Sequence, residues 1–206
     1  MRILVAVLAI PLTACVSTPV IDTKETRFQT KVTLSEFNSV ATQYLAKPTF
    51  AALLTFPNGE SQDTLSYSAD GYGSSYNSYL GVTKNKLGFH VQRTSAQHFV
   101  NAIDKYLKWS DTATQNKEAF TKDITEILYG STQISEFKSY YKLTFHSGNE
   151  SNHYLLVRSC SFNEVVKEIC AGDTAIDRES ALALKNDIKQ FISGEIYQKD
   201  IASKYN

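Results

Sequence analysis

The feature that most constrains this chain is a short apolar run at its N-terminus. Met1 and Arg2 precede the apolar residues 3–10, and Pro11 ends the run. The run is too short to cross a bilayer as a helix, and a positive start followed by an apolar run and small residues is typical of a secretory signal. We therefore expect the rest of the chain to fold outside the cytoplasm, in an oxidising compartment.

The residues after Pro11 indicate a lipid anchor. Leu12, Thr13 and Ala14 precede Cys15, and this order resembles the lipobox of bacterial lipoproteins. In that family a lipid is attached to the cysteine sulfur, a peptidase cuts before the cysteine, and the new amine is acylated. The resemblance implies that Cys15 becomes the first residue of the mature protein and anchors it to a membrane through several acyl chains. It covers residues 1–15, and the alternative is an ordinary secreted protein with a coincidental cysteine.

The residue after Cys15 bears on the location of the protein. Val16 stands where enteric-type bacteria place the aspartate that retains lipoproteins in the inner membrane. The resemblance therefore implies an outer-membrane location with the domain facing the periplasm.

The hydrophobic pattern predicts an α+β fold, in which antiparallel β-meander sheets pack with about three amphipathic helices. A signal peptide over 1–14 and a lipidated cysteine with a tether over 15–27 precede a single globular domain over 28–206, with a suggested division into halves 28–116 and 117–206. Strands followed by a helix recur in both halves, which suggests a duplicated unit. The predicted strands span 50–56, 87–94, 118–129, 140–145 and 154–160, the predicted helices begin at Ser35, Ser95 and Asp177, and turns are predicted at 57–59, 70–71 and 85–86.

Charge and motif content exclude several functions. The chain has 21 basic and 21 acidic side chains, so no basic excess would attract nucleic acid. It contains no glycine-rich phosphate loop, no G-x-S-x-G elbow and no H-E-x-x-H motif, and we predict no cofactor, no metal site and no catalytic residue.

Two cysteines, Cys160 and Cys170, remain in the mature chain. Because the chain is expected in an oxidising compartment, we predict a disulfide between them. The alternative is a catalytic Cys160 thiol with His146 or His153 as its base.

Histidines provide the other candidate chemistry. His146 and His153 lie symmetrically about residues 149–150, so a tight turn would set them opposite each other across a hairpin, where two imidazoles could share a metal ion. With no third ligand at a telling spacing, an exposed cross-strand pair is the favoured interpretation. His90 on a strand and His98 on the following helix could also meet.

A segment rich in tyrosine, serine and glycine, residues 64–82, is the candidate binding surface. Its tyrosines Tyr67, Tyr72, Tyr76 and Tyr79 alternate with small polar residues, a composition in which rigid aromatics supply contact area and small groups supply hydrogen bonds. Tyrosines of this kind also stack on sugars. The alternative is a hairpin with one face on the core and one in water.

These observations leave three hypotheses for function. The first, which we favour, is a non-catalytic outer-membrane lipoprotein that binds an envelope protein or glycan. The second is an envelope hydrolase with dispersed catalytic residues, using His146, His153 or Glu150. The third is a lipoprotein encoded by a mobile element that blocks a surface receptor.

Overall fold

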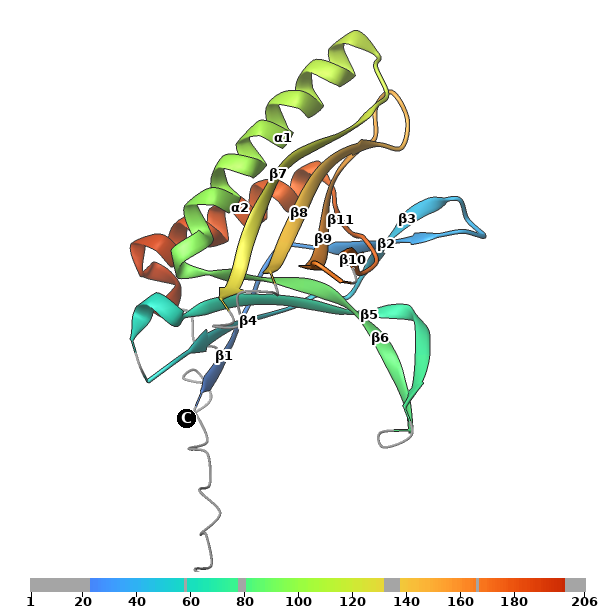
Figure 1. Ribbon diagram of the computed structural model, residues 1–206. Coiled ribbons are helices and arrows are strands. Elements are labelled where there is room, and N and C mark those ends of the chain that lie inside the picture. Colours follow the sequence, from blue (N-terminus) through green and yellow to red (C-terminus); the bar gives the residue numbers. More distant parts are fainter. Residues whose placement is uncertain (1–22, 58, 78–80, 132–137, 166, 199–206) are drawn as a thin grey trace, which may run out of the picture.

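The computed structural model describes residues 23–57, 59–77, 81–131, 138–165 and 167–198. It confirms an α+β fold with antiparallel sheets (Figure 1). The described residues contain two α-helices, α1 (Ala96–Asn116) and α2 (Arg178–Ser193), where the sequence predicted about three. The signal peptide and Cys15 lie outside the described residues.

The smaller sheet has four strands in the order β1-β4-β5-β6. Its strands are β1 (Lys24–Phe28), β4 (Phe50–Thr55), β5 (Thr64–Asn77) and β6 (Gly81–Gln92). Residues 24–27, which the sequence assigned to the tether, thus form most of β1. The predicted strand over 50–56 is confirmed as β4.

The larger sheet has the order β3-β2-β11-β9-β8-β7, and β10 pairs with β9. The two sheets do not follow the suggested halves, because β2 and β3 from the first half join the strands of the second. The strands of the larger sheet are β2 (Leu34–Asn38), β3 (Gln43–Lys47), β7 (Thr121–Ser131), β8 (Lys138–Ser147), β9 (His153–Asn163), β10 (Lys167–Cys170) and β11 (Thr174–Ile176).

The helix predicted to begin at Ser35 is wrong, because this segment forms the β2–β3 hairpin. The Asn38 side-chain oxygen accepts hydrogen bonds from the backbone N–H groups of Val40 and Ala41, at 3.0 and 2.8 Å. Such a local bond favours a turn over a helix. The turn exposes 94% of Val40.

The turns predicted at 70–71 and 85–86 are also wrong, because both lie inside the long strands β5 and β6. The strand register shifts between Asp70 and Ser74, as at a β-bulge, which bends a strand. Figure 1 shows the far ends of β5 and β6 bending away from the rest of the molecule. We call this part of the two strands the arm.

The arm is held against the β2–β3 hairpin where it leaves the body. The Tyr72 backbone N–H donates to the Glu36 carboxylate at 2.7 Å. Lys47 Nζ lies 2.8 Å from the centre of the Tyr72 ring and 3.5 Å from the same carboxylate. One charged pair and one aromatic ring therefore fix the start of the arm.

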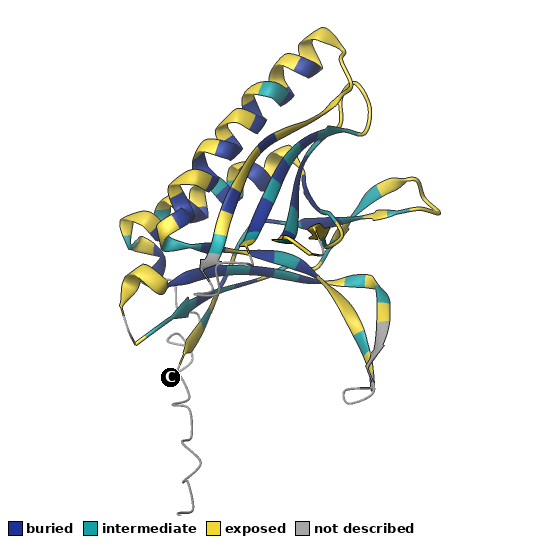
Figure 2. Cartoon of the chain, in the orientation of Figure 1, coloured by how far each residue is buried: buried dark blue, intermediate teal, exposed yellow. Residues whose placement is uncertain are grey.

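A single hydrophobic core joins both sheets and both helices, and Figure 2 shows its buried residues on the inner sides of α1 and the strands. The helices predicted to begin at Ser95 and Asp177 are confirmed as α1 and α2, and the Asp177 carboxylate caps α2 by accepting the Ser180 N–H at 2.7 Å. The core side chains include Phe99, Val100, Ile103, Tyr106 and Leu107 of α1, and Leu184, Ile188 and Phe191 of α2.

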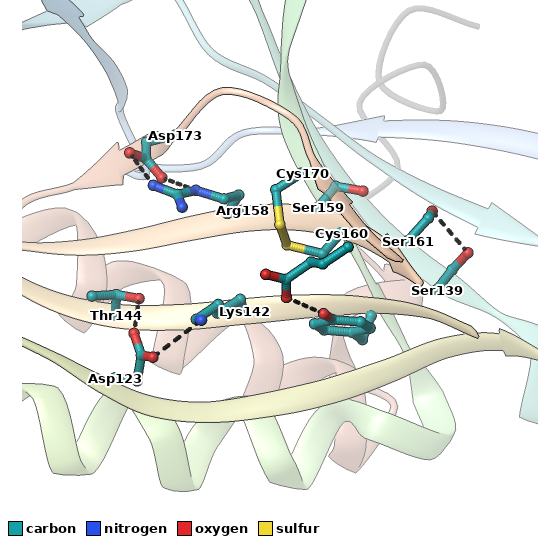
Figure 3. The surroundings of a disulfide bond; sticks show 12 residues. Asp123, Ser139, Lys142, Thr144, Arg158, Ser159, Cys160, Ser161, Cys170 and Asp173 are labelled. Atoms are coloured by element: carbon teal, nitrogen blue, oxygen red, sulfur yellow. Dashed lines mark hydrogen bonds and ion pairs between the residues drawn. A yellow bond between two sulfur atoms is a disulfide. The ribbon is translucent and has the colours of Figure 1, made fainter. Parts of the chain in front are cut away.

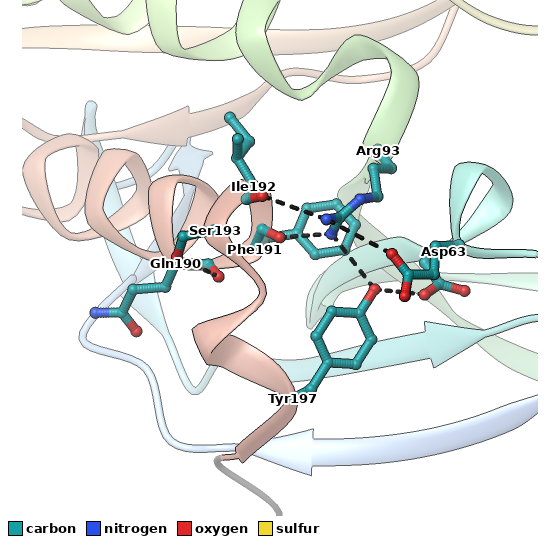
Figure 4. A network of polar contacts seen from close by, with 8 residues as sticks. Asp63, Arg93, Gln190, Phe191, Ile192, Ser193 and Tyr197 are labelled. Carbon is teal, nitrogen blue, oxygen red and sulfur yellow. Dashed lines mark hydrogen bonds and ion pairs between the residues drawn. The ribbon is translucent and has the colours of Figure 1, made fainter.

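An arginine joins the C-terminal end of α2 to the smaller sheet (Figure 4). Arg93 donates to the carbonyl oxygens of Phe191 and Ile192, at 2.6 and 3.3 Å. The last carbonyls of a helix lack partners within the helix, so a cation there satisfies them and suits the helix dipole. The Tyr197 hydroxyl donates to the buried Asp63 carboxylate, and burial followed by this bond raises the pKa of Tyr197 to about 12.

Gly88 is a position where the fold requires glycine. Its φ is +147°, and an added Cβ would collide with the Tyr67 carbonyl oxygen on β5 and lie 3.1 Å from Ser68 Cα. We expect Gly88→Ala to lower the free energy of unfolding by at least about 2 kcal/mol, measured by urea denaturation. Gly172→Ala is the matched control, because nothing lies within 4 Å of its Cβ position. Equal stability of the two variants would contradict the close approach of Gly88 to β5.

Candidate functional site

The structure describes the side chains of two of the four tyrosines predicted to bind a partner, Tyr67 and Tyr72, and they differ in exposure. Tyr67 is fully buried, and its hydroxyl donates to Asp187 on α2 at 3.3 Å. Side chains alternate along β5, so Leu65, Tyr67 and Ala69 face the core. Tyr67 is therefore a core residue and its assignment to the binding surface is wrong. Tyr72 is 50% exposed, while the Tyr76 side chain and all of Tyr79 lie outside the described residues.

The predicted disulfide between Cys160 and Cys170 is confirmed (Figure 3). The two cysteines are directly paired residues of β9 and β10, with Cα atoms 4.0 Å apart. A sulfur bonded in this way is not a thiolate, so the alternative of a catalytic Cys160 is wrong for the oxidised protein.

One group of three potential metal ligands is found among the described residues, and it consists of the two disulfide cysteines, Cys160 and Cys170, and Glu168. Its two sulfurs are bonded to each other, and the Tyr140 hydroxyl donates to the Glu168 carboxylate. With the disulfide intact, one carboxylate remains to bind a cation, which is too few ligands for a structural metal site.

The outer face of the larger sheet carries paired charges (Figure 3). Arg158 donates two hydrogen bonds to Asp173, at 2.7 and 2.8 Å, and Lys142 lies 3.2 Å from Asp123. A hydrogen bond from Thr144 and the nearby Lys142 lower the pKa of Asp123. Each of these two cations is therefore paired with a neighbouring carboxylate.

His146 and His153 do not face each other, so the prediction of a cross-strand pair is wrong. His146 pairs with Tyr154, and Ser147 pairs with His153. Because a shift of one residue turns a strand side chain to the other face, the two imidazoles lie on opposite faces of the hairpin. The turn is also longer than predicted, since the Gly148 N–H donates to the Asn152 carbonyl oxygen at 2.8 Å.

His153 is buried and both of its ring nitrogens have partners. Nδ1 lies 2.8 Å from Ser147 Oγ, Nε2 lies 3.1 Å from Thr114 Oγ1, and the ring stacks on Phe145. Burial lowers the pKa of the His153 imidazole. This histidine is therefore a neutral structural residue in the wall of the site described next. His98, by contrast, lies on the exposed side of α1.

A cleft runs between one face of the β2–β3 hairpin and the start of β9. It consists of a hollow of about 720 Å³ and an adjoining one of about 370 Å³, and Tyr44, Asn152 and Tyr154 line both. We call it the hairpin cleft. The larger hollow is lined by Ser35, Tyr44, Ala46, Ser110, Asp111, Thr114, Gln115, Ser151, Asn152, His153, Tyr154, Asp177, Arg178 and Glu179.

Aromatic side chains occupy the middle of the hairpin cleft. The ring centres of Tyr44 and Tyr154 are 4.6 Å apart, and Tyr44 also contacts His146 and Phe37 edge-on, at 5.9 and 5.4 Å. Burial is the main cause that raises the pKa values of Tyr44 and Tyr154, so both hydroxyls are neutral hydrogen-bonding groups. Phe37 is 50% exposed.

The remaining lining of the larger hollow is polar. Arg178 Nη2 lies 2.9 Å from the Asp111 carboxylate, which ties the start of α2 to α1. Hydroxyl and amide side chains line the same hollow, among them those of Ser110, Gln115 and Asn152. Such groups can both donate and accept hydrogen bonds.

The sequence did not predict this cleft because its apolar spacing placed Tyr44 on a helix. The sequence does contain a signal for the hairpin. Ser35 and Phe37 are every second residue before Asn38, and Tyr44 and Ala46 are every second residue after Thr42. Alternation on both sides of a turn residue predicts a hairpin with one shared face. That face is the one that lines the cleft.

Comparison with protein-family models, with curated proteins and with solved structures gives no significant match. Within the described ranges, neither α-helix combines the length and apolar character needed to cross a membrane. The function is therefore argued from the chemistry of the residues themselves.

The buried His153 predicts a pH-dependent stability. Its pKa is lower in the folded state than the ordinary value of 6.5, so its contribution is complete above about pH 6.5 and is lost as the pH falls from there towards the lower pKa of the folded state. We expect the difference in free energy of unfolding between wild type and His153→Gln to shrink from pH 7.5 to pH 5.0. Denaturant titrations at both pH values measure this difference, and a constant difference would contradict the prediction.

Proposed function

We propose that the mature chain is a non-catalytic lipoprotein of the outer membrane, whose periplasm-facing domain binds another component of the envelope. The observation that carries the proposal is the hairpin cleft. It presents aromatic rings and hydrogen-bonding side chains, the features of a binding site. Two histidines line it, His153 in the larger hollow and His146 in the smaller one. His153 is buried with both ring nitrogens engaged, and the two imidazoles lie on opposite faces of the β8–β9 hairpin, so they cannot act together on one substrate atom.

The start of the fold supports a short link to the proposed anchor. β1 begins at Lys24, and an extended chain from Cys15 to that residue reaches at most about 30 Å. In Figure 1 the Lys24 end of β1 and the loop between β8 and β9 lie at opposite ends of the molecule. A domain tethered through Cys15 can therefore hold the hairpin cleft on the side away from the membrane.

The proposed anchor is tested by changing Cys15, and its proposed membrane by changing Val16. We expect the wild-type chain to fractionate with the outer membrane and to carry acyl chains by mass spectrometry. Cys15→Ser should lose the acyl chains and leave the membrane, because the sulfur that accepts the lipid is absent. Val16→Asp is the matched control: it should stay lipidated and move to the inner membrane. A Cys15→Ser chain that remains lipidated would overturn this part of the proposal.

The binding role is tested by capture from solubilised envelopes, with the full lipidated protein as bait. We expect an envelope component to be retained by the wild type and lost by the Tyr44→Ala/Tyr154→Ala double variant, because both rings lie at the centre of the cleft. Phe50→Ala is the matched control, since Phe50 is an exposed aromatic residue outside the lining of the cleft. Equal retention by the double variant would show that the cleft is not the binding surface.

A further inference from the structure

The hairpin cleft is elongated. Its two hollows share Tyr44, Asn152 and Tyr154, so they adjoin at the tyrosine pair. Their volumes of about 720 and 370 Å³ both fall within the range of clefts that enclose small organic ligands. A ligand that fills both must cross the tyrosine pair, which suits several linked rings better than one compact molecule.

The rings of Tyr44 and Tyr154 suit stacking against a flat, weakly polarised surface of a ligand. Aromatic faces carry partial negative charge, and the C–H groups on one face of a pyranose ring carry partial positive charge. Tyr44 is held in place by Phe37, His146 and Tyr154. A ring fixed in this way loses little side-chain freedom when a ligand stacks on it.

The polar groups of the larger hollow suit a ligand rich in hydroxyl groups. Ser35, Ser110, Gln115, Ser151 and Asn152 line it together with the tyrosines, and their side chains both donate and accept hydrogen bonds, as sugar hydroxyls do. Among the described residues that line this hollow, Ala46 is the one aliphatic side chain. An aliphatic anchor side chain of a protein partner would therefore meet the tyrosine rings and one alanine methyl group, and no other aliphatic side chain, in this lining.

The charges of the larger hollow disfavour anionic ligands. Its described lining contains three carboxylates, from Asp111, Asp177 and Glu179, and one guanidinium, from Arg178. Arg178 is paired with Asp111, and the buried His153 is neutral because burial lowers its pKa. A phosphate or carboxylate ligand would therefore meet net repulsion from the described lining.

Taken together, the geometry points to a neutral glycan strand as the ligand of the hairpin cleft. Sugar rings stack on Tyr44 and Tyr154, and their hydroxyl groups bond to the amide and hydroxyl side chains of α1 and of the loop between β8 and β9. This inference rests on the proposed binding function and names the chemical class of its ligand.

Isothermal titration calorimetry with chitotetraose, a neutral tetrasaccharide, tests the inference. The full lipidated protein is used in a detergent without a sugar headgroup, because a glycosidic detergent would compete for the cleft. We expect saturable binding, and dissociation constants at least about tenfold larger for Tyr44→Ala and Tyr154→Ala, equivalent to about 1.4 kcal/mol. Phe50→Ala, an exposed aromatic residue outside the lining of the cleft, should bind as the wild type does. No saturable binding by the wild type, or binding unchanged by both cleft variants, would overturn the inference.

Two further variants keep the test decisive if an alanine at position 44 unfolds the hairpin. Tyr44→Phe keeps the stacking ring and should bind within about threefold of the wild type. Gln115→Ala removes an amide from an exposed position on α1 and should weaken binding without changing the thermal midpoint. An anionic hyaluronan tetrasaccharide should not bind, and binding as tight as that of chitotetraose would overturn the preference for a neutral ligand.

The outcomes separate the glycan ligand from the proposed function. If no oligosaccharide binds while capture from envelopes yields a protein that the Tyr44→Ala/Tyr154→Ala double variant loses, the glycan ligand is overturned and the binding function stands. If neither a glycan nor an envelope component depends on the cleft, both are overturned. Binding of chitotetraose that requires Tyr44 and Tyr154 supports both.

Discussion

A column of packed aromatic rings holds the two sheets and α1 together. Tyr67 of the smaller sheet stacks on Phe89, which contacts Phe99 of α1 and Tyr141 of the larger sheet, with ring centres 5.5 to 6.4 Å apart. Aromatic pairs at such distances stabilise a core beyond the burial of their area. The Tyr141 hydroxyl in this column also has a hydrogen-bond partner, because it accepts the His90 backbone N–H at 2.9 Å.

The hairpin cleft depends on this column indirectly, through the sheet and helices that line the cleft. The larger sheet supplies the start of β9, α1 supplies Asp111 and Gln115, and α2 supplies Arg178. These elements meet because their inner faces share one core. Side chains from separate parts of the chain can therefore line a single cleft, although none of them belongs to a linear motif.

Much of the fold followed from the sequence where periodicity and capping agreed. The helices beginning after Ser95 and Asp177 were predicted correctly, as were the β8–β9 hairpin and the disulfide between Cys160 and Cys170. The errors arose where local spacing fitted two structures. Residues 35–47 have apolar positions that suit a helix. The Asn38 side-chain oxygen, however, accepts the backbone N–H of Val40, and such a local hydrogen bond favours a hairpin turn. Tyr67 was misplaced because composition does not say which face of a strand is buried, and the cleft was missed because contacts between distant strands have no sequence signature.

The β2–β3 hairpin makes contacts on both of its faces. One face carries Phe37 and Tyr44 into the cleft, and the other carries Glu36 and Lys47 to Tyr72 at the start of the arm. Because these side chains alternate on the same two short strands, one hairpin forms both the cleft wall and the support of the arm. A tilt of the hairpin that widens the cleft must also shift the support on which the arm rests.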